Sequence, residues 1–146
     1  MSTDNFIEVL FVEDRPEDAD LAIRSLKKHN LINKVKLVED GQEALDYLFK
    51  EGPYQGENYI LPKLVLLDLK LPKVNGLEVL ERMKSDATLK KIPVVILTSS
   101  NEDIDIKKAY ELGVNSYIVK PVDFQKFADA MQQLGMYWLL LNKYPD

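Results

Sequence analysis

Short apolar runs alternate along the chain with longer stretches in which apolar residues recur every three or four positions. The runs lie at residues 7–12, 35–38, 64–69, 94–98 and 116–120. They are rich in Val, Ile and Leu, and the first, third and fourth are apolar almost throughout. Strands of a parallel sheet that is covered by helices on both faces have this composition. We therefore predict five strands.

A helix is predicted after each of these strands. The expected helices cover residues 16–30, 40–49, 75–86, 102–113 and 123–141. Pro16 and the acidic residues after it favour a helix start, and Asp40 with Glu43 resembles a capping box. The spacing of Leu21 and Leu26 suggests that both lie on the buried face of the first helix.

Five repeats of strand and helix predict an α/β fold. Short connections imply right-handed crossovers, and hence a (βα)5 doubly wound, open, parallel five-stranded sheet. The 146 residues fit one domain of ordinary size, so we expect residues 1–146 to form a single domain. The last helix should continue as an extended apolar C-terminal helix from about residue 135.

Polar residues lie at the carboxyl ends of four of the five predicted strands. They are Glu13 and Asp14 after the first, Asp68 in the third, Thr98 in the fourth and Lys120 in the fifth. Ligands of such folds bind outside the carboxyl ends of the strands, where these side chains should converge. A charge at the end of a buried strand is costly unless it is paired, bound to a metal or open to water.

The three carboxylates of this group call for a cation. Glu13, Asp14 and Asp68 offer hard oxygen ligands without His or Cys, which suits Mg²⁺. Mg²⁺ usually binds one or two carboxylates together with phosphate oxygens, so the site matches a phosphoryl group. Lys120 could pair first with Asp68 and then with a phosphoryl oxygen, while Thr98 could donate to another. Attack of a carboxylate on phosphorus would give an acyl phosphate.

Composition narrows the partners and the compartment. The 24 acidic and 19 basic residues give a net charge of −5, which disfavours nucleic acid as the main partner. No apolar run approaches the ~20 residues of a membrane-spanning helix, so we expect no membrane partner. The chain has no cysteine, which suits a reducing compartment, and we expect a cytoplasmic protein.

In combination, these residues resemble the receiver domain of two-component response regulators. The matching features are Glu13-Asp14, Asp68 with Pro72 and Gly76 downstream, Thr98, Tyr117 and Lys120-Pro121. The 30 residues from Asp68 to Thr98 and the 22 from Thr98 to Lys120 are similar to the spacing that is usual in this family. The resemblance covers about residues 7–134 and implies a flavodoxin-like receiver fold.

The resemblance also implies a role for each acidic residue. Asp68 would be the phosphoacceptor. Asp14 and Asp68 would bind Mg²⁺ directly, joined by the backbone carbonyl of Lys70, and Glu13 would act through a bound water. The family pattern therefore predicts a Mg²⁺ cofactor at the site.

The remaining matched residues would stabilise and report the phosphoryl group. Lys120 is similar to the phosphate-contacting lysine of the family, and its bond to Pro121 is expected to be cis. Thr98 and Tyr117 resemble the switch pair, in which the hydroxyl turns toward the phosphoryl group and the ring rotates inward.

A histidine kinase is the phosphodonor that the resemblance implies. His29 is the only histidine of the chain, so a phosphohistidine must come from another protein or be replaced by a small phosphodonor. We therefore predict no enzyme activity beyond the receiver's own phosphorylation and slow dephosphorylation. The segments EGPYQGENYILP and MYWLLLNKYP resemble single-domain response regulators that serve phytochrome-type histidine kinases.

The apolar C-terminal tail at residues 136–141 predicts an interaction surface. One domain core is unlikely to bury a segment that is apolar on every side. We expect a homodimer through the predicted helix 102–113, the strand 116–120, the helix after it and this tail. The alternative is that the tail folds back over its own domain.

Other functions remain open at this point. An aspartyl-phosphate phosphatase would want a second carboxylate two residues after Asp68, where the chain has Lys70. A flavodoxin-like cofactor carrier would want a phosphate-binding loop after the first strand, where EDRPEDAD is strongly acidic. A receiver-like scaffold that binds partners without phosphorylation is the third alternative.

Overall fold

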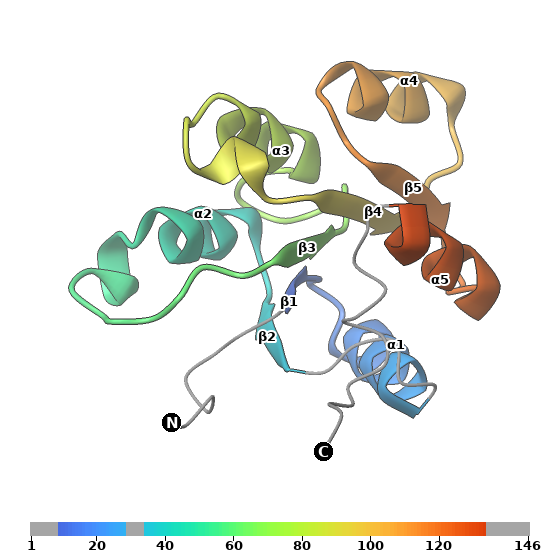
Figure 1. Cartoon of the computed structure of the whole chain (residues 1–146), viewed down its shortest axis with the longest axis horizontal. Coiled ribbons are helices and arrows are strands. Elements are labelled where there is room, and N and C mark those ends of the chain that lie inside the picture. The colour runs from blue at the N-terminus through green and yellow to red at the C-terminus, as the bar shows by residue number, and fades with distance from the viewer. Residues whose placement is uncertain (1–8, 29–33, 134–146) are drawn as a thin grey trace.

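The strands form one parallel sheet in the order β2-β1-β3-β4-β5 (Figure 1). The computed structural model describes residues 9–28 and 34–133. The strands are β1 (Val9–Val12), β2 (Val35–Val38), β3 (Leu64–Leu67), β4 (Val94–Thr98) and β5 (Ser116–Val119). The predicted doubly wound α/β fold is thus confirmed.

Within the described residues, five helices cover the two faces of this sheet. They are α1 (Pro16–Lys28), α2 (Gly41–Phe49), α3 (Gly76–Lys84), α4 (Asp103–Glu111) and α5 (Phe124–Gln133), with short 3₁₀ helices η1 (Gly52–Tyr54) and η2 (Leu89–Lys91). Helices α1 and α5 lie on one face, and α2, α3 and α4 lie on the other (Figure 1). The predicted helical extension from about 135 falls outside the described residues. No helix within the described ranges is long and apolar enough to span a membrane.

The central strands are buried on both faces, which explains their continuous apolar composition. In β1, Leu10 and Val12 belong to the core under α2, α3 and α4. Val9 and Phe11 point to the opposite core, under α1 and α5. Successive side chains of a strand alternate between faces, so both positions of the repeat must be apolar here.

Two strands end earlier than the apolar pattern indicates. Strand β3 ends at Leu67 and β5 at Val119, so Asp68 and Lys120 each come directly after a strand. The sheet still holds both residues, because the Asp68 N–H donates to the Val12 carbonyl at 3.1 Å. The Lys120 N–H donates likewise to the Thr98 carbonyl at 2.8 Å. Both side chains are thereby fixed at the carboxyl edge of the sheet.

The prediction that Leu21 lies on the buried face of α1 is wrong. Leu21 is 69% exposed, and the buried face consists of Ala19, Ala22 and Leu26. Leu21 and Leu26 are five residues apart, which is about 140° around a helix of 3.6 residues per turn. One helix face therefore cannot bury both leucines.

The start of α2 is capped by Asp40, as predicted. Its Oδ1 accepts a hydrogen bond of 2.7 Å from the Glu43 N–H. The reciprocal half of a capping box is shifted by one residue, because the Glu43 carboxylate accepts from the N–H of Glu39 at 3.1 Å. Both carboxylates thus bind backbone N–H groups at this helix end.

Glycine at two positions allows the loop after β3 to pack closely. A Cβ at Gly76 would lie 2.1 Å from the backbone oxygen of Asp68, and a Cβ at Gly41 would lie 1.7 Å from that of Val74. The Gly76 N–H donates to the Leu69 carbonyl at 2.8 Å. Glycine therefore lets the β3–α3 loop and the start of α2 approach each other directly beside Asp68.

Candidate functional site at the carboxyl edge of the sheet

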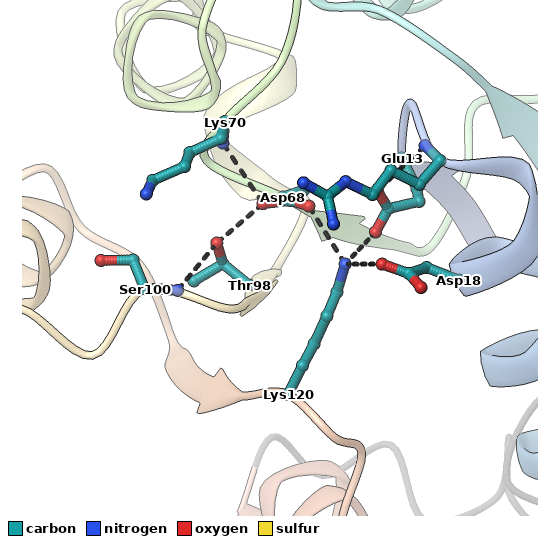
Figure 2. Close-up of polar contacts among 8 residues, drawn as sticks. Glu13, Asp18, Asp68, Lys70, Thr98, Ser100 and Lys120 are labelled. Carbon is teal, nitrogen blue, oxygen red and sulfur yellow. Dashed lines mark hydrogen bonds and ion pairs between the residues drawn. The ribbon is translucent and has the colours of Figure 1, made fainter.

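The Asp68 side chain is nearly buried and fully engaged in hydrogen bonds. Its Oδ1 accepts from the Thr98 hydroxyl at 2.7 Å and from the Lys70 N–H at 3.2 Å. Its Oδ2 accepts from Lys120 Nζ at 3.1 Å (Figure 2). The side chain is only 8% exposed, and these partners offset the cost of burying its charge.

Lys120 contacts three carboxylates, one directly after β1, one directly after β3 and one in α1. Its Nζ forms a hydrogen bond with Glu13 Oε1, contacts Asp68 and lies 3.6 Å from Oδ2 of Asp18 in α1 (Figure 2). Burial disfavours the charged ammonium, but the hydrogen bond to Glu13 and the charge of Asp68 outweigh it and raise the pKa of Lys120. The lysine therefore carries a positive charge at neutral pH.

Glu13 is the most buried acidic residue of this group. Its side chain is inaccessible to solvent, and its Oε2 accepts a hydrogen bond of 3.2 Å from the Arg15 N–H. Burial raises the pKa of Glu13, the charge of Asp68 raises it further, and Lys120 opposes both. The charged form of the buried Glu13 carboxylate consequently depends on the positive charge of Lys120.

The predicted acidic cluster is present. Glu13, Asp14 and Asp68 each offer a carboxylate oxygen, and these oxygens lie within 4.8 Å of one another. Three negative charges so close together are balanced only in part by one lysine. This oxygen-only donor set fits a hard divalent cation that would neutralise the remaining charge. The Lys70 carbonyl stays a predicted ligand, because the contact of Lys70 with Asp68 is made by its N–H.

The predicted switch residues are linked through Ser100. The Tyr117 hydroxyl donates to the Ser100 carbonyl at 2.8 Å, and the Ser100 N–H lies 3.5 Å from Thr98 Oγ1. The Ser100 hydroxyl donates in turn to Asp105 in the first turn of α4, at 2.6 Å. One loop thus connects the hydroxyl beside Asp68 with the tyrosine ring and α4.

Sequence reasoning missed two of these contacts and anticipated one backbone feature. The peptide bond between Lys120 and Pro121 is cis, as expected. Asp18 and Asp105 were not identified as partners of site residues, because acidic residues in the first turn of a helix are favoured by the helix dipole alone. A signal for Asp18 was its position in the first turn of α1, only four residues after Asp14 in the sequence.

Comparison with known proteins assigns the site to a family. Residues 9–132 match the response regulator receiver domain family. The chain belongs to this family. It is 41% identical over 142 residues to the probable methanogenesis regulatory protein FilR2 of Methanothrix harundinacea, covering 97% of this chain and 89% of that protein. It is 38% identical over 131 residues to the response regulator Rcp1 of Synechocystis, covering 90% and 88%.

Solved structures agree with this assignment. The bacteriophytochrome response regulator AtBRR is 51% identical, with a TM-score of 0.83 over 94% of this chain and 99% of that chain. The Mn²⁺-bound form of Rcp1 is 35% identical, with a TM-score of 0.73 over 96% and 99%. The predicted family and receiver fold are therefore confirmed. The protein is a phosphorelay response regulator. The alternatives, which were a non-phosphorylated scaffold, a phosphatase and a cofactor carrier, are not favoured.

Proposed function

We propose that this receiver accepts a phosphoryl group on Asp68 from a histidine kinase. The observation that carries the proposal is the position of the Asp68 carboxylate, which touches both Lys120 Nζ and the Thr98 hydroxyl within a cluster of acidic oxygens. A carboxylate held between a cation and a hydroxyl donor is suited to attack phosphorus and to share its neighbours with the group that it receives.

Transfer would form an Asp68 Oδ–P bond and break the P–N bond of the phosphohistidine, with the electron pair going to the ring nitrogen. Lys120 and Thr98 would then bind phosphoryl oxygens in place of their present contacts with Asp68. Asp14 and Asp68, with Glu13 acting through water and the Lys70 carbonyl, would hold Mg²⁺. Bound there, Mg²⁺ supplies positive charge that offsets the negative charge of the phosphoryl group.

The phosphorylated state would be reported through the loop that contains Ser100. When the Thr98 hydroxyl leaves Asp68 for a phosphoryl oxygen, the contacts of Ser100 with Tyr117 and Asp105 change with it. The signal would thus pass to α4 and β5. The receiver's own chemistry would consist of its phosphorylation and slow dephosphorylation.

A phytochrome-type histidine kinase is the partner that the relatives support. AtBRR is described as a bacteriophytochrome response regulator and is 51% identical to this chain. Phosphotransfer from a purified phytochrome-type kinase should be faster than from a histidine kinase of another sensor class. Equal rates with both kinases would contradict this pairing. We propose a cytoplasmic location for both partners.

A homodimer through α4, β5, α5 and the C-terminal tail is the proposed output form of this receiver. Ile104 and Tyr110 on α4 and Val119 on β5 are exposed apolar side chains, and α4 and β5 lie side by side (Figure 1). The predicted tail segment, residues 136–141, lies outside the described residues. Light scattering should show a dimer that is weakened by Ile104→Glu and by removal of residues 136–146, and an unchanged mass would reject the interface.

Phosphorylation itself is tested with acetyl phosphate and Mg²⁺ on phosphate-affinity gels. The wild-type chain should shift, and the shift should disappear in Asp68→Asn and after chelation of Mg²⁺. Asp103→Asn is the matched control, because Asp103 is an exposed residue in the first turn of α4. Equal modification of the wild type and Asp68→Asn would contradict the proposal.

A further inference from the structure

An open pocket adjoins the site on the side of α1. It has a volume of about 420 Å³ and lies between α1 and the segment that follows β5. Leu21, Pro121 and Val122 give it apolar walls, and the charged groups among its lining residues are Asp18 and Lys120. The exposed Leu21, which the helix pattern had placed in the core, is therefore part of the pocket.

Of the three carboxylates that contact Lys120, that of Asp18 is the one exposed to this pocket. Its Oδ2 lies 3.6 Å from Lys120 Nζ, and the same nitrogen lies 3.1 Å from Oδ2 of Asp68. Figure 2 shows Asp18 and Asp68 approaching this ammonium from different sides. The Asp18 side chain is 42% exposed, whereas those of Glu13 and Asp68 are buried. The Asp18 carboxylate thus faces the pocket and shares Lys120 Nζ with the Asp68 carboxylate.

We propose that Asp18 selects phosphodonors by the charge of their leaving group. The inference rests on the proposed phosphorylation of Asp68. In each transfer the Asp68 Oδ–P bond forms, the donor's bond to phosphorus breaks, and its electron pair goes to the leaving atom. A phosphoimidazole protonated on its ring releases neutral imidazole as the leaving group, and phosphoramidate protonated on nitrogen releases ammonia. Acetyl phosphate releases acetate, which is an anion.

The Asp18 carboxylate acts on these leaving groups with opposite sign. It attracts a ring or amine that still carries part of its positive charge in the transition state, and it repels a developing acetate. The apolar walls formed by Leu21, Pro121 and Val122 suit the faces of an imidazole ring. Since Asp18 is partly exposed, water weakens the effect, and we expect about a threefold discrimination for the single charge.

A purely structural role for Asp18 predicts a different result. Asp18 also stands in the first turn of α1, where an acidic residue favours the helix dipole, and it contacts Lys120. If it only held that helix or that lysine, its loss would change the reaction with every donor by the same factor. The ratio of the rates for two donors therefore separates the two roles.

The experiment compares acetyl phosphate with phosphoramidate at the same Mg²⁺ concentration. Second-order rate constants are measured by quenched time courses on phosphate-affinity gels for the wild type, Asp18→Asn, Asp18→Glu and Glu17→Gln. Glu17 is the matched control, because it is an exposed acidic residue in the same helical turn. Affinity for beryllofluoride, which has no leaving group, measures the binding of a phosphoryl mimic separately.

Asp18→Asn should raise the ratio of the acetyl phosphate to the phosphoramidate rate constant about threefold. Asp18→Glu should restore the ratio, Glu17→Gln should leave it unchanged, and salt should reduce the difference. An unchanged ratio in Asp18→Asn would overturn the inference, as would loss of reaction with both donors in a folded variant. A wild-type chain that neither donor modifies would instead refute the proposed phosphorylation.

Discussion

The Thr98 hydroxyl donates a 2.7 Å hydrogen bond to Oδ1 of Asp68, which connects the ends of β4 and β3. Thr98 is fully buried, so this hydroxyl depends on the site for its hydrogen bond. A phosphoryl group on Asp68 would offer it a more strongly charged acceptor at nearly the same place. We therefore expect the switch to begin with movement of the Thr98 hydroxyl from Asp68 Oδ1 to a phosphoryl oxygen.

Removal of this hydroxyl should weaken the binding of a phosphoryl mimic. We expect Thr98→Ala to lower the affinity for beryllofluoride in the presence of Mg²⁺ about tenfold or more, because a hydrogen bond to a charged acceptor contributes about 1.5–3 kcal/mol. Thr98→Ser retains the hydroxyl and should stay within about threefold of the wild type. Titration calorimetry measures both values, and equal affinities for Thr98→Ala and the wild type would refute the assigned role.

The pair of Glu13 and Lys120 should control stability. Lys120→Met leaves the buried Glu13 carboxylate without its cation, and we expect the free energy of unfolding to fall by about 3 kcal/mol. Adding Glu13→Gln should recover at least about 1 kcal/mol, because it removes the unpaired charge. Urea unfolding measures the cycle, with the exposed Lys126→Met as control. A double variant as unstable as Lys120→Met would contradict the coupling.

The bond from Ser100 to Asp105 should hold the loop that meets Tyr117. Asp105→Ala removes the acceptor of the Ser100 hydroxyl, and we expect the NMR signals of the Tyr117 ring to shift. Stability should fall by about 1 kcal/mol more than in Asp103→Ala. Both variants remove one acidic residue from the first turn of α4, so the dipole effect cancels. If the two variants have identical Tyr117 spectra, the link does not exist.

The sequence predicted which polar side chains converge at the sheet edge better than it predicted where the strands end. The edge of the sheet could be predicted because β1, β3 and β4 are apolar on both faces and their polar ends must meet. The end of β3 was misplaced because Leu69 is buried beneath the loop without belonging to the strand. Hydrophobicity reports burial and cannot show where the ladder of hydrogen bonds stops.

The side-chain network depended on orientations that a residue pattern does not contain. Tyr117 was expected to act as a switch, but its acceptor is a backbone carbonyl at Ser100, and every residue has such a carbonyl. Asp18 was hidden for a related reason, because its contact with Lys120 needs the register between α1 and the end of β5. Residue types therefore indicated the chemistry of the site, and the fold was needed to show which side chains contact each other.

Tyr59, in the segment between α2 and β3, should make the stability of the protein depend on pH in the alkaline range. The Tyr59 hydroxyl donates to the Tyr47 carbonyl at 2.5 Å, and the two rings stack with centroids 4.5 Å apart. Burial, together with the charges of Tyr47 and Glu57, raises the pKa of Tyr59 from 10.0 to about 12. The folded pKa exceeds the unfolded one, so this contribution to stability is complete below pH 10 and is lost as the pH rises through about 12.

Tyr59→Phe removes this titration. Urea unfolding between pH 9 and pH 12 should show a smaller loss of stability in Tyr59→Phe than in the wild type, since one group with a raised pKa is absent and a pKa difference of one unit corresponds to about 1.4 kcal/mol. The partly exposed Tyr110→Phe is the control and should follow the wild type. If Tyr59→Phe loses stability with pH as steeply as the wild type, the raised pKa is refuted.

The site of phosphorylation is the central claim, and chemical trapping tests it most directly. An aspartyl phosphate is reduced by borohydride to homoserine, whereas a free carboxylate is not. After incubation with acetyl phosphate and Mg²⁺, reduction and tandem mass spectrometry should find homoserine at position 68, and none when Mg²⁺ is chelated. Homoserine at position 14, or at any position other than 68, would contradict the assignment of Asp68 as the phosphoacceptor.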